Sequence, residues 1–538
     1  MTAPSPAAPA YFRTNAGQWT IAAVFLAVFV ALAWLQRVPS VTTANDDATY
    51  ILLSRSLREG GYNSIHLVGA PVHTKYPPVF PALLAGVSTI ASESINAFAA
   101  MNIALSVAAL ALVFATAKRL LPPSVALGAL AMGASNPFLQ GTSGTVMSEP
   151  AFLALIALTV WTLSRMPLTP RNIVLACVCV SLAALTRTVG ATLVLAVIAL
   201  LLLERRWRSA AVYGGLITLG IVATSLWLKS RAMPELAADY ITDAITTGNQ
   251  ASPNPVAMVA GRVVENAPQY AGTLLWVLSF PAIGGTIADN LLWLVVTCIA
   301  LATGLLVLWG RWRIVPVFAL IYGALILAWP WVIGRFLIPV LPLLAVAFLA
   351  GVHTLVERWG SRAASTAVIA LVAIIAITGL SRAATKIATR SQCERQHAML
   401  SPSCFNADQL SFFAAARYVG DQTPPSAIVM SGNEGTFFYL ANRRLVPVDS
   451  INARPPDGAA DFLLRENVSY AVVNHVSFED LPLSERLLSA CAHLEPAAEF
   501  PPRTTVFRVM PSPVAESRAC EILRDFRRDA GEFLPQIF

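Results

Sequence analysis

The sequence predicts a polytopic α-helical membrane protein with a C-terminal α/β domain outside the membrane. Of its 538 residues, 56% are hydrophobic and only 12% are charged, whereas ordinary soluble domains contain about 25% charged residues. Charged residues are scarce between residues 18 and 382 and ordinary toward the two ends. Long apolar runs indicate helices, because a helix satisfies its own backbone polar groups when lipid surrounds it.

The basic residues predict the topology. The formal net charge of +7 fits the excess of Lys and Arg in cytoplasmic loops, and it does not indicate a nucleic-acid partner, since no basic stripe or aromatic RNA-binding motif accompanies it. If all basic clusters face the cytoplasm, spanning helices are expected at residues 18–38, 97–117, 122–140, 149–165, 172–187, 189–204, 209–230, 289–310, 314–333, 336–356 and 363–382.

Two further apolar pieces, 77–92 and 271–286, are short and are expected to enter the membrane without a full crossing. The first contains three prolines near its start, which favours an irregular or re-entrant segment. The total expected is therefore about 11–13 membrane segments.

The domain organisation follows from these changes in composition. Residues 1–17 are expected to form a cytoplasmic tail, and residues 18–390 a membrane domain whose first periplasmic loop is 39–76. Residues 391–538 are polar and are expected to form a periplasmic α/β domain.

Short runs within residues 391–538 predict its secondary structure. Strands are predicted at Ala427–Ser431, Tyr470–Asn474 and Thr504–Met510, and helices at Gln409–Val419 and Glu485–Cys491. An exported domain permits disulfides, and the two candidate pairs are Cys393 with Cys404 and Cys491 with Cys520.

The same topology brings several charged residues to one face of the membrane, the face opposite the basic loops. Charges at helix ends within a membrane are costly unless they are paired or functional. Their convergence on one side therefore suggests a site. The residues are Asp46, Asp47, Lys75, Glu149, Arg187 and Arg335.

The stretch 45–84 resembles the first external loop of the GT-C glycosyltransferases. It opens with Asp46-Asp47-Ala48-Thr49-Tyr50 and closes with Lys75-Tyr76-Pro77-Pro78. The most similar members are the bacterial protein O-mannosyltransferases and lipid A aminoarabinose transferases. Weaker likenesses lie in Ser148-Glu149-Pro150, Leu185-Thr186-Arg187, residues 334–339 and residues 423–448.

This resemblance implies the fold of that superfamily and a sugar donor linked to a polyprenyl phosphate. Relatives often have Asp where this chain has Glu149, and the spacing of Lys-Tyr-Pro-Pro differs by one residue from the aminoarabinose type. Because of these departures, the resemblance does not identify the sugar or the acceptor. It bears more directly on the class of reaction.

The acidic pair is the candidate catalytic group. Transfer from a polyprenyl phosphate needs a base for the acceptor hydroxyl, and a positioned carboxylate contributes about 10²–10⁴-fold. We hypothesise that Asp46 is this base and that Asp47 orients the acceptor or tunes the pKa of its neighbour. The alternative is that either acid only caps a helix that begins near Thr49.

The candidate ligands of the donor phosphate are cations, because negative charge grows on the leaving phosphate. Lys75 suits an anionic head group, although it could instead extend to the membrane interface. Arg187 and Arg335 could clamp the same phosphate, or pair with an acid such as Glu149.

Substrate positioning is expected of Tyr50, Tyr76 and Glu149. The tyrosines are expected to line the site or anchor at the interface. The glutamate is expected to align the acceptor or bind a divalent ion, or only to complement a helix dipole.

No cofactor is required by these residues, and a divalent cation is the one addition that the acids allow. The candidate metal ligands are Asp47, Glu149, His66 and His73. Two histidines seven residues apart supply too few ligands for a closed site, so surface or interface histidines are the favoured interpretation.

The function predicted is an inverting glycosyltransferase in a bacterial inner membrane. Its partners would be a polyprenyl-phosphate sugar donor, the lipid bilayer and a periplasmic lipid, glycan or protein acceptor. The alternatives are a non-catalytic membrane scaffold for envelope polysaccharide assembly and a secondary transporter. A transporter would show two related halves, which the sequence does not reveal.

Overall fold

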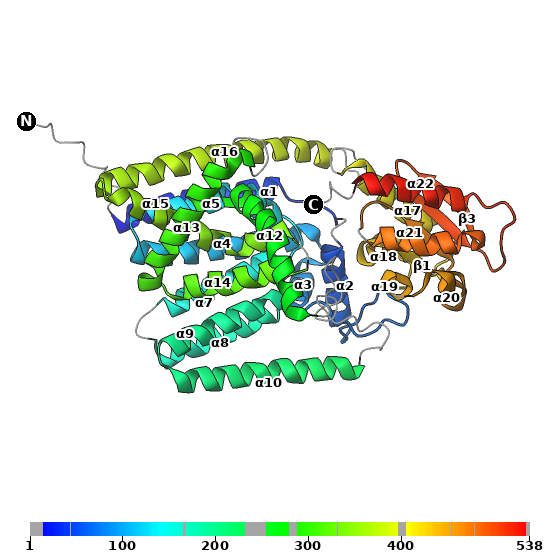
Figure 1. Cartoon of the computed structure of the whole chain (residues 1–538), viewed down its shortest axis with the longest axis horizontal. Helices are drawn as coiled ribbons and strands as arrows, with labels where there is room; N and C mark the ends of the chain where they lie inside the picture. Colours follow the sequence, from blue (N-terminus) through cyan, green and yellow to red (C-terminus); the bar gives the residue numbers. More distant parts are fainter. Residues whose placement is uncertain are drawn as a thin grey trace, which may run out of the picture.

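The computed structural model describes residues 14–42, 45–164, 168–231, 254–278, 288–330, 332–395, 405–452, 454–477 and 479–533. Most of the long helices lie side by side in one bundle, and a smaller domain that contains the sheet sits at one end of this bundle (Figure 1). The bundle helices are α1 (Asn15–Leu35), α4 (Ile95–Leu120), α5 (Pro123–Ser135), α7 (Glu149–Leu163), α8 (Pro170–Ala184), α9 (Ala191–Leu203), α10 (Trp207–Arg231), α12 (Pro255–Leu278), α13 (Leu291–Arg311), α14 (Ile314–Ala328), α15 (Leu341–Glu357) and α16 (Ser361–Arg395).

Within the described ranges, five helices are long and apolar enough to span a membrane. They are α1, α4, α13, the stretch Gly334–Glu357 that contains α15, and α16 as far as Arg390. Shorter apolar helices accompany them, among them α5, α7, α8, α9 and α14. The protein is therefore a multi-pass helical membrane protein, as the sequence predicts.

Glycines bring two bundle helices into backbone contact. A Cβ on Gly304 of α13 would lie 1.7 Å from the Ala347 carbonyl oxygen, and a Cβ on Gly351 of α15 would lie 1.7 Å from the Ala300 carbonyl oxygen. Only glycine permits so close a crossing, which is a common way of packing helices in membranes. This contact fixes α15 and, directly before it, the 3₁₀ segment η4 (Gly334–Val340).

Two short helices, α2 (Asp46–Arg58) and α3 (Val79–Ala91), lie at the end of the bundle that faces the sheet domain (Figure 1). Helix α3 has 13 residues, about 20 Å at 1.5 Å per residue, which is less than the hydrocarbon core of about 30 Å. Its first amide, at Val79, donates to the Leu185 carbonyl at 2.9 Å. This short helix occupies most of the predicted segment 77–92.

The other short apolar piece is only partly described. Residues 271–278 continue α12, and residues 279–286 lie outside the described residues.

The ends of α4, α9 and α13 lie at the end of the bundle away from α2 (Figure 1), and basic residues are found there. Arg311 at the end of α13 donates to the Leu120 carbonyl at the end of α4, at 3.3 Å. Arg313 pairs with Glu204 at the end of α9, at 2.7 Å. The separation of these arginines from α2 is the arrangement on which the predicted topology depends.

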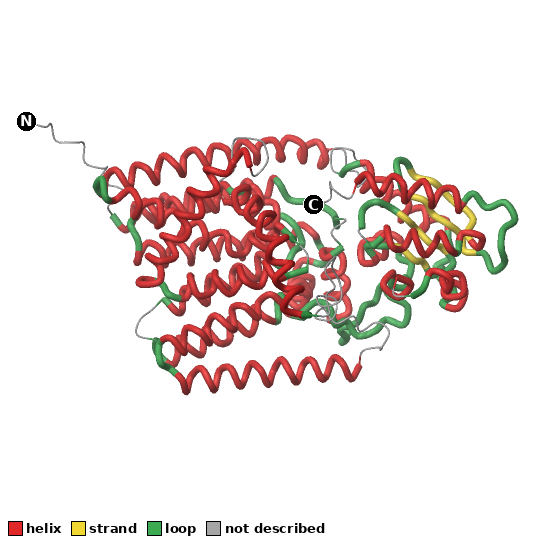
Figure 2. Tube along the Cα trace, viewed as in Figure 1, coloured by secondary structure: helices red, strands yellow, loops and turns green. Residues whose placement is uncertain are grey.

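The smaller domain is a four-stranded sheet with helices on both faces (Figure 2). The strands are β1 (Val429–Ser431), β2 (Tyr470–Val473), β3 (Leu494–Phe500) and β4 (Thr504–Val509), in the order β1-β2-β4-β3. The first pair is parallel and the others are antiparallel. Its helices are α17 (Ala407–Gln422), α18 (Glu434–Ala441), α19 (Val448–Asn452), α20 (Ala459–Arg465), α21 (Asp480–Ser489) and α22 (Ala519–Phe533).

Alternation along the strands explains the two layers of helices. Ala471 and Val473 of β2 join one buried cluster, and Val472 between them joins the other. Successive side chains of a strand point to opposite faces, so a strand that is apolar throughout needs cover on both faces.

The three predicted strands correspond to β1, β2 and β4. The predicted helix Gln409–Val419 falls within α17, whereas the predicted helix Glu485–Cys491 overlaps the end of α21 and runs two residues past it. Strand β3 escaped prediction because its sequence, LEPAAEF, contains a proline and two glutamates, residues that strands disfavour. The predicted disulfide between Cys491 and Cys520 is confirmed. The other candidate pair stays a prediction, because Cys404 lies outside the described residues.

The first loop is bound to the sheet domain by backbone pairing. The Leu445 amide donates to the His66 carbonyl, and the Leu445 carbonyl accepts from the Val68 amide, both at 2.9 Å. Leu445 also forms a bridge with Val429 of β1. The loop thus adds to the edge of the sheet, so the loop and the domain form one structural unit.

Candidate active site

Helix α2 divides the acidic pair between two environments. Asp46 is the first residue of this helix and Asp47 the second. Successive residues of a helix are turned by about 100°, so the two carboxylates point in different directions. Tyr50 stands one turn after Asp46 and therefore shares its face.

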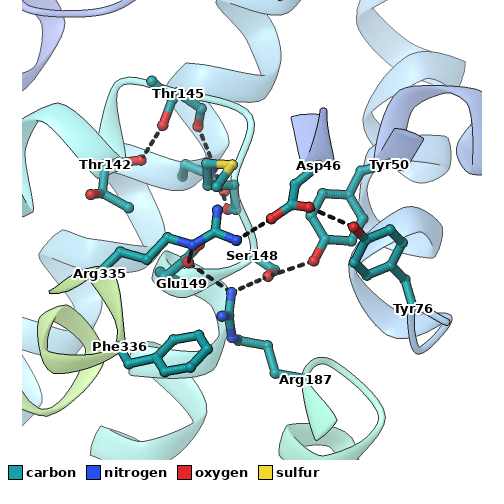
Figure 3. Close-up of polar contacts among 12 residues, drawn as sticks. Asp46, Tyr50, Tyr76, Thr142, Thr145, Ser148, Glu149, Arg187, Arg335 and Phe336 are labelled. Carbon is teal, nitrogen blue, oxygen red and sulfur yellow. Dashed lines mark hydrogen bonds and ion pairs between the residues drawn. The ribbon is translucent and has the colours of Figure 1, made fainter. Parts of the chain in front are cut away.

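Asp46 lies between a tyrosine and an arginine (Figure 3). The Tyr76 hydroxyl donates to Asp46 Oδ1 at 2.5 Å, and the Arg335 guanidinium forms an ion pair with Oδ2. Burial favours a higher pKa for Asp46, but the Arg335 charge and the bonds from Tyr76 and Arg335 outweigh burial and lower the pKa below its ordinary value. Asp46 is therefore ionised at neutral pH and can accept a proton.

A second acid of the site pairs with both of its arginines. Glu149, at the start of α7, is 1% exposed and pairs with Arg187 Nη1 at 2.8 Å and with Arg335 Nε at 3.7 Å. Arg335 thus lies between the two acids. Two carboxylates and two guanidiniums make this cluster formally neutral; it is called the four-charge cluster below and consists of Asp46, Glu149, Arg187 and Arg335.

Ser148 joins this cluster to Tyr50. Its Oγ lies 2.8 Å from Arg187 Nη1, which donates to it, and 3.0 Å from the Tyr50 hydroxyl. Ser148 precedes α7 but makes no capping bond to that helix, so its hydroxyl serves these two partners. The preceding loop is held by Asn102, whose Nδ2 donates to the Thr145 and Met147 carbonyls at 2.7 and 2.9 Å.

Asp47 has a structural environment. Its oxygens accept from the backbone amides of Thr42 at 2.6 Å and Ala48 at 2.9 Å, and its side chain is buried. Burial raises the pKa of Asp47 to about 6, although the two amide bonds oppose this. The predicted catalytic pair is therefore brought into the site only through Asp46, because Asp47 faces the backbone that precedes α2.

Lys75 lies between the site and the sheet domain. It makes no ion pair within 4 Å among the described residues. Burial favours a lower pKa for Lys75, but the carboxylates of Glu479, Glu434, Asp449 and Asp46 outweigh burial and raise the pKa. Three of these four acids belong to the sheet domain, so Lys75 faces both that domain and the four-charge cluster.

The histidines predicted as weak metal ligands hold the first loop instead. His73 Nε2 accepts from the Tyr76 amide at 2.9 Å, and Nδ1 is 2.9 Å from Ser64 Oγ. The His73 ring stacks on Tyr76 with centroids 5.3 Å apart. Burial lowers the pKa of His73 to about 3, so its ring is neutral and orients the tyrosine that contacts Asp46.

His66 is buried, which lowers its pKa to about 4, and its carbonyl pairs with Leu445. Across the described ranges, no group of three or more His, Cys, Asp or Glu side chains is arranged to hold a metal. The candidate metal ligands Asp47, Glu149, His66 and His73 are thus not grouped together: Asp47 bonds to backbone amides, Glu149 to arginines and His73 to Ser64 and Tyr76.

An apolar cavity of about 290 Å³ adjoins η4. Its walls come from α12, α13, α14, η4 and α15, and Leu337 and Val340 belong to the segment that carries Arg335. Tyr322 lines the cavity and donates to the Phe336 carbonyl at 2.6 Å. Apolar walls thus adjoin the charged cluster, an arrangement that suits a lipid with an anionic head.

The sequence indicated each of these acids, arginines and tyrosines, but it missed Ser148 and Asn102 as site residues. Ser148 appeared only as part of a Ser-Glu-Pro motif, and serine before a helix ordinarily indicates a cap. Asn102 could have been found from the sequence, because a lone Asn within an apolar helix needs a polar partner in lipid.

Similarity to known proteins appears in one family model and in solved structures. Residues 75–228 match the family of dolichyl-phosphate-mannose-protein mannosyltransferases. This segment includes Lys75, Glu149 and Arg187, and excludes Asp46 and Arg335. No curated protein matches the sequence significantly.

The fold is similar to that of ArnT from Cupriavidus metallidurans bound to undecaprenyl phosphate, with 13% identity, a TM-score of 0.53, and 94% of this chain and 100% of that chain covered. It is also similar to the archaeal oligosaccharyltransferase AglB from Archaeoglobus fulgidus in complex with an inhibitory peptide and a dolichol-phosphate, with 13% identity, a TM-score of 0.52, and 85% and 69% of the two chains covered. At this identity the likeness shows the fold. The chain therefore has the fold of the GT-C membrane glycosyltransferases, as its first loop predicts.

Proposed function

We propose that the protein is an inverting glycosyltransferase that moves a sugar from a polyprenyl-phosphate donor to an acceptor hydroxyl. The observation that carries this proposal is Asp46, an ionised carboxylate held between the Tyr76 hydroxyl and Arg335. An apolar cavity adjoins the segment η4, which carries Arg335. A base, phosphate-binding cations and an apolar wall are the three parts that this reaction needs.

In the proposed reaction, the acceptor oxygen forms a bond to the anomeric carbon while its proton passes to Asp46. The bond from that carbon to the phosphate oxygen breaks, and its electron pair leaves with the phosphate. One displacement of this kind inverts the anomeric centre. The growing negative charge on the phosphate meets Arg335 and Arg187, and Lys75 supplies a third positive charge.

The donor also alters the cluster that it enters. Without a phosphate, Arg335 is engaged by Asp46 and Glu149. A phosphate that pairs with Arg335 would loosen its bond to Asp46 and leave this carboxylate free for the acceptor. Tyr50, Tyr76 and Glu149 would then position the substrates, the tyrosines by lining the site and Glu149 by holding Arg187.

The solved structures of similar fold support a lipid-phosphate donor, since ArnT is bound to undecaprenyl phosphate and AglB to a dolichol-phosphate. The cavity beside η4 is the proposed place for the first isoprenyl units. We place the protein in a bacterial inner membrane, with its N-terminus in the cytoplasm and its sheet domain, residues 391–538, in the periplasm. The acceptor would be a periplasmic lipid, glycan or protein.

The test uses purified full-length protein in lipid nanodiscs and a panel of polyprenyl-phosphate sugars. We expect one donor to release polyprenyl phosphate when a periplasmic glycolipid or glycan fraction is added, and the Asp46→Asn variant to bind that donor without release. A scaffold would bind a donor and never release polyprenyl phosphate, and a transporter would move a donor across a vesicle unchanged. Either outcome would refute the proposal.

A further inference from the structure

The first loop supplies the N-terminal cap of a helix in the sheet domain. Asn45 Oδ1 accepts from the amides of Gly435 and Thr436, in the first turn of α18, at 2.9 and 3.3 Å. A capping side chain ordinarily bonds these second and third amides from within its own helix. Asn433, which precedes α18, has a left-handed backbone with φ of 55° and makes no side-chain cap. Asn45 therefore caps α18 from 390 residues away.

Asn45 is also the residue directly before Asp46. Its φ is 63°, a conformation that asparagine adopts more readily than most residues. Its side chain makes no capping bond to α2, because its oxygen is committed to α18. The same residue thus directly precedes α2, which carries Asp46, and caps α18.

Two further contacts hold α18 against α2. The Thr436 hydroxyl donates to the Thr42 carbonyl at 2.9 Å. A Cβ on Gly435 would lie 2.4 Å from Thr49 Oγ1 and 2.9 Å from Asn45 Oδ1. No side chain fits between these two helices, so the approach of α18 to α2 depends on glycine at this place.

We propose that Asn45 is a positioning residue, through which the sheet domain sets where the Asp46 carboxylate stands. The inference rests on the proposed function in that Asp46 is its base. The two halves of the site then have different supports. The membrane bundle holds Glu149, Arg187 and Arg335, whereas the sheet domain and the first loop hold Asp46. Movement of the domain would shift the base relative to the cations.

The variants separate the cap from backbone strain. Asn45→Gly removes the cap and keeps a residue that tolerates positive φ, whereas Asn45→Asp keeps an acceptor oxygen. Gly435→Ala adds a Cβ that collides with α2. The matched control is Gly458→Ala in the same domain, where φ is −92° and an added Cβ would meet nothing within 4 Å.

The readouts are amide hydrogen exchange of the full-length protein and steady-state kinetics with the donor. For Asn45→Gly we expect the amides of Gly435 and Thr436 to exchange about two- to tenfold faster, in keeping with the loss of a hydrogen bond, and those of the first turns of α2 to lose protection with them. The kcat should fall about tenfold to a hundredfold, as for a displaced catalytic group, while KM for the donor stays the same. Asn45→Asp should restore both, Gly435→Ala should resemble Asn45→Gly, and Gly458→Ala should behave as wild type.

Two results would overturn the inference. One is faster exchange in α18 with no change in α2, which would make the cap a local feature of the sheet domain. The other is an unchanged kcat in Asn45→Gly despite lost protection in both helices. If the wild-type protein transfers no sugar at all, the proposed function fails, and exchange in α2 alone still decides whether the two helices are coupled.

Discussion

Two groups of carboxylates interact with Lys75 of the first loop, and the two groups have different charged neighbours. In the four-charge cluster, Asp46 and Glu149 face two arginines. On the sheet domain, burial and the Asp449 carboxylate raise the pKa of Glu434, and burial with Glu434 and Asp449 raises the pKa of Glu479. Lys75 is the cation that lowers both of these pKa values. The acids outnumber the cation there.

The two groups differ in the direction in which the pKa of their carboxyl groups is shifted. The pKa of Asp46 is lowered because its arginine and tyrosine partners outweigh burial. Burial and the neighbouring acids raise the pKa of Glu479 to about 8. Burial thus makes a carboxyl group a weaker acid unless cations compensate, and the compensated group is the one that is ionised and placed to take a proton.

Exchange of the two neighbouring acids tests this comparison most strongly. Asp46→Asn should reduce transfer by about 10²–10⁴-fold because it removes the base, while binding of the donor remains. Asp47→Asn should have a much smaller effect, since Asp47 lies outside the four-charge cluster and the one oxygen of asparagine can keep one of its two bonds from the Thr42 and Ala48 amides. Release of polyprenyl phosphate measures both. Equal losses in the two variants would contradict the assignment of Asp46 alone.

Removal of Arg335 should affect both binding and pH dependence. Arg335→Met deletes a cation that lowers the pKa of Asp46, so that pKa should rise. An ionised base is needed, so activity is present above this pKa and lost below it. The acidic limb of the pH–rate profile should therefore move to higher pH in the variant.

Binding of the donor to Arg335→Met should also weaken by about tenfold or more, since hydrogen bonds to charged groups contribute about 1.5–3 kcal/mol. Arg335→Lys should recover part of the binding, because lysine keeps the charge but cannot form a bidentate pair. An unshifted acidic limb in Arg335→Met would show that Asp46 does not govern the rate.

Lys75 interacts with acids of both groups, so its removal tests whether it serves the donor site or the sheet domain. Lys75→Met should raise KM for the donor by about tenfold if the lysine contacts the phosphate, in keeping with the worth of one charged hydrogen bond. It should also raise the pKa of Glu479 further, because a cation that lowers this pKa is lost. A variant with altered stability but unchanged KM would assign Lys75 to the sheet domain alone.

The smallest effect is expected from Glu479→Gln, and it concerns stability. The folded state holds a proton on Glu479 up to pH about 8, whereas the unfolded chain releases it near the ordinary value of 4.5. Stability should therefore fall as the pH rises between these two values. The glutamine variant should show a flatter Tm against pH over this range. The exposed residue Glu516 provides the control, as Glu516→Gln, and an equally flat curve for both variants would remove Glu479 as the cause.

Much of the fold was predictable because composition dictates it. The apolar run between residues 18 and 382 requires helices in lipid, and the runs that became β1, β2 and β4 are rich in β-branched and aromatic residues. Strand β3 was not predictable, since pairing with β4 along its length outweighs the poor propensity of its own residues.

The sequence predicted that several charged residues share one face, and the structure brings four of them into contact, but their pairing could not be predicted. The sequence placed Asp46, Glu149, Arg187 and Arg335 at one face of the membrane because helix ends with charges must converge there. Asp46 and Asp47 were predicted to act as a pair. Successive residues of a helix are turned by about 100°, so the two carboxylates bond to different partners. The role of Asn45 depends on a contact with residues 390 positions away, which no local pattern reveals.

The most direct test locates the donor. A polyprenyl phosphate with a photoreactive group beside its phosphate would be cross-linked to the full-length protein, and the labelled peptides identified by mass spectrometry. The four-charge cluster predicts labels on the segments around Tyr76, Ser148 and Arg335. Labels confined to the basic end of the bundle near Arg311 and Arg313, or to the acids around Glu434 and Glu479, would contradict the proposed site.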